Sequence, residues 1–158
     1  MPYIHLTTFI EAPRERVFDL SRSIDLHKFS MKHHEEQVIN GVMNGLMNIN
    51  DDVTWKAKHV FRERILKIRI TEMQRPDFFC DEQVNGDFLS LKHEHYFKTI
   101  ENGTIMIDQF RYELKKNFIT RLVNRIYLEK YMTRLLEERN AVIKSAAEGN
   151  QWKQFLSS

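Results

Sequence analysis

The sequence predicts an α+β fold, in which a curved antiparallel sheet of about seven strands wraps around one long C-terminal helix. The first observation is an alternation of apolar and polar residues between residues 36 and 114, which is the period of a strand with one buried face. The second is a helical period after Lys116, which no glycine or proline interrupts before Gly149. A helix of that length must bury its apolar side, and the concave face of a twisted sheet is the only surface large enough.

Length and composition indicate one globular domain and exclude several classes of protein. The chain has 158 residues, of which 42% are hydrophobic and 29% charged, and its formal charge is +2. A charge this small predicts no nucleic acid or acidic membrane surface as a partner. The 5 glycines and 3 prolines are too few for a disordered chain, and the single cysteine, Cys80, excludes an internal disulfide. No apolar run approaches about 18 residues and no signal-peptide pattern begins the chain, so we expect a cytoplasmic protein without integral membrane association.

The N-terminal segment predicts a strand followed by two short helices. Tyr3–Ile10 is rich in β-branched and aromatic residues, which favours a strand. Pro13 ends this strand and suits the first turn of a helix, where its missing N–H costs nothing. A second helix follows soon after, with Ser23 or Asp25 as its N-cap.

Turn signals divide the middle of the chain into strands. Arg75-Pro76-Asp77 and Asn102-Gly103 are typical turn sequences, and Asn85-Gly86 is the strongest hairpin signal because both residues accept positive φ. Asn40-Gly41 and Asn44-Gly45 could also be hairpin turns, but we expect one bulged strand there, followed by a turn at Asn48–Asp52. The expected strands are Gln37–Met47, Asp52–Val60, Phe61–Met73, Phe78–Val84, Phe88–Ile100 and Thr104–Leu114.

The C-terminal segment predicts one helix of roughly seven or eight turns. Its apolar stripe extends from Ile119 to Ala146, and charged residues occupy the opposite face. Gly149 is well placed to end the helix. The tail that follows contains Trp152 but is too short for a second domain, so we expect a single domain over residues 1–148 and a C-terminal tail over residues 149–158.

Five local strings, together with this order of elements, resemble a known superfamily. They are Thr8–Pro13 (TFIEAP), Arg16–Leu20 (RVFDL), Val53–His59 (VTWKAKH), Phe79–Phe88 (FCDEQVNGDF) and Lys92–Phe97 (KHEHYF). On these residues the chain is similar to the START-like superfamily (SRPBCC; polyketide cyclase/dehydrase and lipid-transfer-like proteins) over most of its length, and in particular to a bacterial subgroup of cyclase-like or cell-division-inhibitor-like proteins. The segment Leu114–Phe118 is poorer in glycine and proline than that subgroup, so we expect a local difference where the last helix begins.

The resemblance implies a helix-grip fold and a cavity between the sheet and the long helix that takes a hydrophobic small molecule. It does not imply a single activity, because this fold hosts transporters, cyclases, hydrolases and receptors. We therefore expect a monomer or homodimer that binds such a molecule, and transports or sequesters it, without any cofactor. The alternatives are a cyclase- or hydrolase-type enzyme, such as a polyketide cyclase/dehydrase, and an interaction protein that docks a partner through its helix or tail.

Polar residues on the apolar faces of three predicted strands form the candidate site. His93 and His95 share the inward face of one strand, Asp108 lies on that of the next, and His59 on that of an earlier one. Such a cluster could orient the polar head group of a ligand, or act as a general base with Asp108 holding the imidazole tautomer. The alternative is that these groups are satisfied within the core. His93, His95 and Asp108 are thus the catalytic candidates, and the expected cavity lining is Trp55, Ala57, His59, Leu91, His93, His95, Met106, Asp108, Phe110 and, from the helix, Ile126 and Leu135.

Metal-binding interpretations receive less support. His93 and His95 point the same way and could share a zinc ion if His59 or Asp108 supplied a third ligand, but we expect no metal. The string His33-His34-Glu35-Glu36 looks like a metal site, yet adjacent residues point in different directions and the HExxH spacing is absent, so we expect a solvated loop. No P-loop, GxGxxG or GxSxG motif occurs in the chain.

Overall fold

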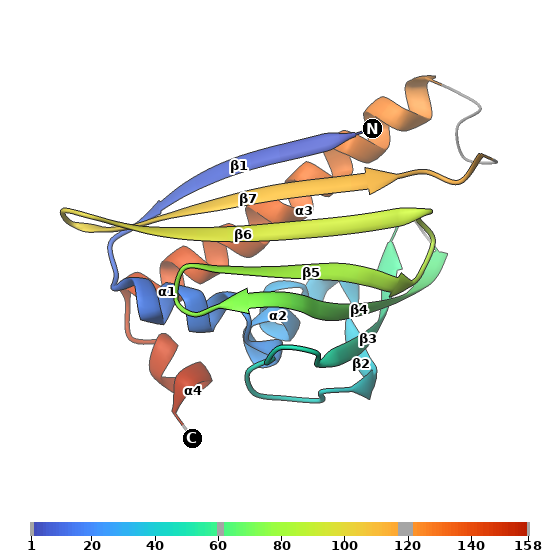
Figure 1. Ribbon diagram of the computed structural model, residues 1–158. Coiled ribbons are helices and arrows are strands. Elements are labelled where there is room, and N and C mark those ends of the chain that lie inside the picture. Colours follow the sequence, from blue (N-terminus) through green and yellow to red (C-terminus); the bar gives the residue numbers. More distant parts are fainter. Residues whose placement is uncertain (1, 60–61, 117–121, 158) are drawn as a thin grey trace.

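The computed structural model describes residues 2–59, 62–116 and 122–157 of the chain, and Figure 1 shows its elements. Within those ranges the strands are β1 (Tyr3–Ile10), β2 (Gln37–Gly41), β3 (Asp52–His59), β4 (Arg62–Gln74), β5 (Phe78–Asn85), β6 (Ser90–Ile100) and β7 (Gly103–Glu113). The helices are α1 (Arg14–Ser21), α2 (Ile24–Ser30), the 3-10 helix η1 (Lys32–His34), α3 (Leu122–Glu148) and α4 (Trp152–Leu156). The predicted α+β fold is confirmed.

The described strands form one antiparallel sheet in the order β1-β7-β6-β5-β4-β3-β2. Strands adjacent in sequence are neighbours in the sheet, except that β1 pairs with β7. β6 and β7 pair continuously from Ser90 to Ile100, which aligns the inward positions of the two strands. This register places His95 opposite Asp108 and His93 opposite Phe110.

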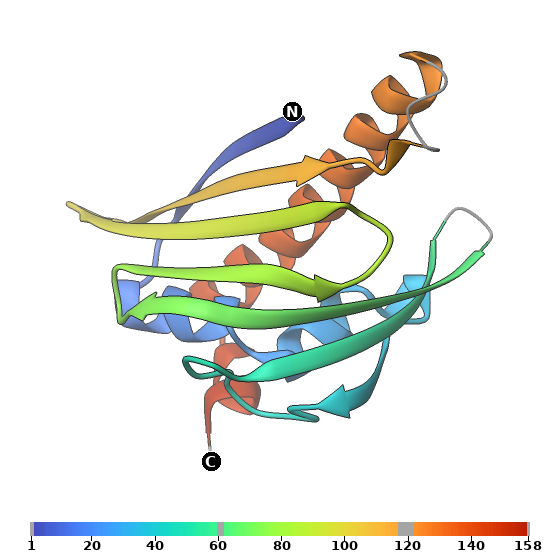
Figure 2. The same ribbon diagram turned by 45° about the vertical axis from the view of Figure 1, so that its right-hand side comes forward.

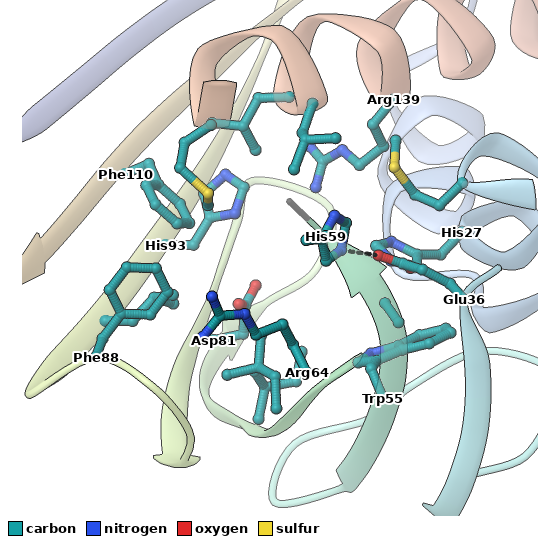
Figure 3. Close-up of a pocket in the computed structure, with 18 of the residues that line it drawn as sticks. His27, Glu36, Trp55, His59, Arg64, Asp81, Phe88, His93, Phe110 and Arg139 are labelled. Carbon is teal, nitrogen blue, oxygen red and sulfur yellow. Dashed lines mark hydrogen bonds and ion pairs between the residues drawn. The ribbon is translucent and has the colours of Figure 1, made fainter. Parts of the chain in front are cut away.

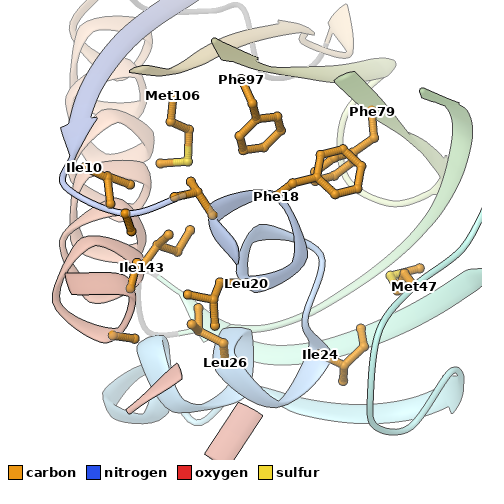
Figure 4. Packing of buried hydrophobic residues seen from close by; sticks show 14 of the residues in the cluster. Ile10, Phe18, Leu20, Ile24, Leu26, Met47, Phe79, Phe97, Met106 and Ile143 are labelled. Atoms are coloured by element: carbon orange, nitrogen blue, oxygen red, sulfur yellow. The ribbon is translucent and has the colours of Figure 1, made fainter. Parts of the chain in front are cut away.

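The helices cover the concave side of the sheet. Figures 1 and 2 agree that α3 lies obliquely behind the strands, with α1 and α2 beside its C-terminal half. The interior at that end is filled by apolar side chains: Figure 4 shows Phe18 and Leu20 of α1 near Phe79, Met106 and Ile143. The Phe18 ring packs edge-to-face on Phe79, with centroids 5.4 Å apart. This packed end fixes α3 against the sheet.

The strand expected over Gln37–Met47 is shorter in the structure. The expected bulge is present between Val38 and Asn40, but β2 ends at Gly41. There φ is +84°, and a β-carbon would lie 2.2 Å from the carbonyl oxygen of Asp52. The chain turns at Gly41 because glycine alone accepts both the conformation and this close approach.

The connection between β5 and β6 is also longer than predicted. The Asn85-Gly86 pair predicted a tight hairpin turn, but β6 begins only at Ser90. The Gln83 side chain closes the loop by donating to the carbonyl oxygen of Phe88 at 2.9 Å. A side-chain hydrogen bond from the strand therefore replaces the two-residue turn.

The helix boundaries follow the predicted signals where the structure describes them. Ser23 is the N-cap of α2, since its hydroxyl accepts from the N–H of Leu26 at 3.1 Å. α3 ends at Glu148, directly before Gly149. The predicted start of this helix, including Ile119, and the predicted strand boundary at residues 60–61 lie outside the described residues. None of the helices in the described ranges has the length and hydropathy of a membrane span.

The C-terminal tail forms α4, which packs on α1. The Arg16 guanidinium lies 4.0 Å from the centroid of the Trp152 ring, a cation–π contact. Phe155 lies 5.8 Å from Phe29 of α2, measured between ring centroids. The tail thereby covers apolar surface that α1 and α2 leave open.

Candidate functional site

A cavity of about 290 Å³ lies between the sheet and α3. Its wall is mostly apolar and includes Trp55 of β3, Phe110 of β7, Leu135 of α3 and Phe88 of the loop before β6. Figure 3 shows Phe88 and Phe110 on one side of this space and Trp55 on the opposite side. Residues of two packed apolar clusters border this cavity: Phe79 belongs to the cluster around α1, and Leu136 belongs to a second cluster with Tyr112 and Leu114.

Most residues predicted to line a cavity lie in this wall. They come from inward positions on β3, β6 and β7 and from the apolar stripe of α3, as the periodicity predicted. They are Trp55, Ala57, His59, Leu91, His93, His95, Phe110 and Leu135. That these side chains bind a ligand stays a prediction.

Three predicted lining residues are not in the cavity wall. Met106 is fully buried in the packed core, where the Ser21 hydroxyl of α1 lies 3.4 Å from its sulfur. Ile126 is 48% exposed because the first turns of α3 extend beyond the sheet (Figure 2). Asp108 is fully buried behind His93 and is covered from α3 by Arg139. Its carboxylate does not border the cavity, but it contacts His93 and Arg139, which do.

Two histidines and two aspartates form a buried His–Asp cluster at the cavity wall. His93 Nε2 donates to Asp108 at 2.7 Å, and His95 Nε2 donates to Asp81 at 2.7 Å. The two imidazole rings stack with centroids 3.7 Å apart, and Phe79 stacks on His95 at 4.0 Å. Because β5 and β7 flank β6, the aspartates approach the histidines from either side. The rings are held in one orientation by these contacts.

Helix α3 completes the cluster with two polar residues that the sequence analysis did not select. Arg139 Nη2 donates to Asp108 at 2.9 Å, and Asn140 Nδ2 donates to the same carboxylate at 2.7 Å. Both residues are buried. They interrupt the apolar stripe between Leu136 and Ile143, and this interruption is the signal that could have identified them, because a polar group on a buried helix face needs a partner.

The cluster pairs each buried carboxylate with a nitrogen donor of another strand or helix. Asp108 lies 2.9 Å from the Arg139 guanidinium, and Asp81 lies 2.7 Å from His95 Nε2. Burial alone would raise the pKa of Asp108, but the charge of Arg139 and the hydrogen bond from His93 hold it well below the usual value. Burial, and then the neighbouring His95, lower the pKa of His93 to about 4, so this ring is neutral at pH 7.

A second polar group, the Glu36 cluster, lies on the other side of the cavity (Figure 3). Glu36 accepts a hydrogen bond from His27 Nε2 at 2.6 Å and lies 3.4 Å from His59 Nε2. His59 Nδ1 is hydrogen-bonded to the Tyr131 hydroxyl at 2.8 Å, and the His27 ring packs on Trp55 with centroids 4.3 Å apart. Burial would raise the pKa of Glu36, but the two imidazoles lower it to about 2, so it is ionised.

The expectation of a solvated loop at His33-His34-Glu35-Glu36 is confirmed for His33 and Glu35, which are exposed, and is wrong for His34 and Glu36. The side chain of Glu36 is 9% exposed and that of His34 is 17% exposed. Glu35 ends η1 in the left-handed conformation with φ of +56°, and Glu36 follows it into the cavity wall. Sequence reasoning missed Glu36 and His27 because no strand period or long helical stripe includes them.

The side chains at the site can exchange hydrogen bonds and protons with a bound molecule. Cys80 is buried, and burial raises the pKa of its thiol to about 12, so it is no nucleophile. His93 combines a hydrogen bond to a buried carboxylate with a place in the cavity wall, which is the arrangement of a general base.

The fold and the site define a helix-grip protein with an internal, mostly apolar cavity, the architecture expected from the START-like resemblance. The chain is similar to the solved structure of TTHA0849 from Thermus thermophilus, with a TM-score of 0.71 and 18% identity over 92% of this chain and 99% of that chain. It is also similar to the di-domain ARO/CYC StfQ from the steffimycin biosynthetic pathway, with a TM-score of 0.75 and 11% identity over 94% of this chain and 51% of that chain. The ginseng major latex-like protein 151 from Panax ginseng has a TM-score of 0.63 and 13% identity over 94% of this chain and 98% of that chain.

These likenesses establish the fold, because the identities are too low to carry an activity. No protein family and no curated protein matches the chain in sequence.

Proposed function

We propose that the protein binds a hydrophobic small molecule in the cavity between the sheet and α3, and so transports or sequesters it. The observation that most supports this proposal is the cavity of about 290 Å³ in an interior that otherwise contains two packed apolar clusters. Protein interiors are normally filled, so a hollow of this size leaves apolar surface without partner atoms. Its volume is near the lower bound of small-molecule sites, about 300 Å³.

The arrangement of polar groups indicates the kind of ligand. The polar side chains His93, Arg139, Glu36 and His59 line the cavity together with many apolar side chains. Burial of an apolar body would supply most of the affinity, at about 25 cal/mol per Å². The polar groups would set its orientation. We therefore expect a compact, mostly apolar molecule that carries hydrogen-bonding groups.

Thermal unfolding and native mass spectrometry test this proposal. The purified protein is incubated with fatty acids, isoprenoids and aromatic polyketides, and at least one compound should raise the Tm and appear as one ligand per chain, because a ligand bound only to the folded state stabilises it. Leu135→Trp should abolish the response, since the larger side chain fills the cavity from α3.

Ile126→Trp is the matched control, because it makes a similar change on the same helix at an exposed position. This variant should respond to the ligand as the wild type does. An unchanged response in Leu135→Trp, or no response of the wild type to any compound class, would contradict the proposal.

A second candidate is a cyclase- or hydrolase-type enzyme, and the His93–Asp108 hydrogen bond at the cavity wall favours it. A neutral imidazole held in one tautomer can remove a proton from a bound substrate. The likeness to an ARO/CYC structure makes poly-β-ketone analogues reasonable test substrates. Wild type should convert such an analogue to a cyclised product with loss of water, and His93→Gln should bind it without turnover. Equal turnover by both proteins, or none by either, counts against this candidate.

A further inference from the structure

Outside the cavity wall, two histidines and one glutamate converge on a single point. Nε2 of His33 and Nε2 of His34 lie 3.1 and 3.3 Å from Oε2 of Glu138. One donor atom from each residue lies within 4.8 Å of the other two. We propose that His33, His34 and Glu138 bind a divalent transition-metal ion of the zinc type.

The donor set fits this ion. Two imidazoles and one carboxylate are ligands that Zn²⁺ accepts, and three protein ligands leave a fourth position for water. The site is also accessible, since the side chains of His33 and Glu138 are 59% and 34% exposed. An ion could reach it from solvent without displacing the core.

The distances agree with tetrahedral coordination. Metal–ligand bonds of about 2.0–2.1 Å hold neighbouring donor atoms about 3.3 Å apart at the corners of a tetrahedron. The two nitrogen–oxygen distances to Glu138 already have nearly this length. The rings of His33 and His34 converge because they share one turn of η1, where their centroids are 4.1 Å apart. Binding would therefore need only small side-chain movements.

The carboxylate is free of competing cations in the part of the chain that the structure describes. There, the ion pairs of Glu138 are those with His33 and His34 alone. The His–Asp cluster differs in this respect, because Arg139 already supplies a buried positive charge beside its donors. A metal cation is therefore better accommodated at Glu138 than at the His–Asp cluster.

An ion at this position would join η1 to α3 beside the Glu36 cluster. The His34 ring lies 5.2 Å from the His59 ring and 6.5 Å from the Tyr131 ring, measured between centroids. Because His59 and Tyr131 line the cavity, the ion would fix one part of its rim.

Metal titration of the full chain tests the site. Protein freed of metal by EDTA is titrated with Zn²⁺ in a calorimeter and with Co²⁺ in a spectrophotometer. We expect one ion per chain, a higher Tm with Zn²⁺, and cobalt absorption typical of tetrahedral coordination. Glu138→Gln and His33→Ala should each weaken binding by at least about tenfold, because each removes a direct ligand.

His5→Ala is the control, because His5 is an exposed histidine of β1 that contacts Tyr3 and Thr7. It should bind zinc as the wild type does. Circular dichroism establishes that each variant is folded, which is expected because the two substituted ligands are surface residues. No zinc uptake by the wild type, or uptake that Glu138→Gln leaves unchanged, overturns the proposal.

Discussion

At the scale of single residues, Asp108 is the buried carboxylate that pairs with the charge of Arg139 and orients His93. Its carboxylate has no exposed surface and accepts hydrogen bonds from His93, Arg139 and Asn140. A buried charge is tolerated only when partners of this kind replace water. The position of the His93 ring and of the Arg139 guanidinium in the cavity wall depends on this one side chain.

Replacing Asp108 by asparagine should destabilise the protein by about 3 kcal/mol, because the buried guanidinium of Arg139 loses its closest counter-charge. Urea unfolding at pH 7 measures the change. Glu63→Gln is the control, since Glu63 pairs with Lys56 on the surface and should contribute little. Equal stability of Asp108→Asn and wild type would show that this network does not hold the interior together.

His93 predicts a specific pH dependence of stability. Its folded pKa of about 4 lies below the unfolded value of 6.5, so between these values the unfolded chain binds a proton that the folded chain does not. This contribution therefore lowers the free energy of unfolding as the pH falls from 6.5 to 4, by at most about 1.4 kcal/mol per pH unit.

Urea titrations between pH 4 and pH 7 compare wild type with His93→Gln. The variant should lose part of this slope, whatever its stability at pH 7. Parallel curves for the two proteins would show that His93 is not held neutral by burial and by the adjacent His95.

At the scale of elements, two short helices, α2 and η1, position cavity residues that the periodicity of the strands and of the long helix does not predict. α2 is brief, yet its first turn is anchored by Ser23 and its next turn carries His27 into the cavity wall. η1 then reverses the chain so that Glu36 meets His27. The Glu36 cluster thus depends on local caps as much as on the sheet.

Ser23→Ala should cost about 1 kcal/mol in the free energy of unfolding, because the N–H of Leu26 loses its acceptor in a buried position. Ser145→Ala in the exposed face of α3 is the matched control and should be neutral or slightly stabilising. If both substitutions have the same effect in urea unfolding, the cap does not stabilise α2.

At the scale of the whole molecule, the interior contains both packed apolar clusters and a cavity. Phe97 is 2% exposed and packs on Phe18 in the cluster around α1, with ring centroids 5.1 Å apart. Leu135 borders the cavity. Removing atoms from a packed core creates a new void, whereas removing them from a cavity wall enlarges an existing one.

Phe97→Ala should therefore destabilise the ligand-free protein by about 3–5 kcal/mol, and Leu135→Ala by less than about 2 kcal/mol. Chemical unfolding of both variants at one temperature measures the difference. Similar losses per removed carbon would show that the cavity wall is packed as tightly as the core.

Much of the fold could be predicted because strand and helix periods are local properties. The alternation in β6 and β7 predicts the inward positions of His93, His95 and Asp108, and all three are buried. The same alternation could not distinguish Met106, which enters the packed core, from Phe110, which lines the cavity, because both lie on the same face of β7. Only the position of α1 separates them.

By itself, the sequence determined the order of the main elements, the inward faces of the strands and the end of the C-terminal helix, since each follows from the spacing of neighbouring residues. The tertiary structure decided the hollow in the core, the pairing of Arg139 with Asp108, and the convergence of His33 and His34 on Glu138. These features join segments far apart in the chain, and their distances depend on how the helices pack against the sheet, which no local period encodes.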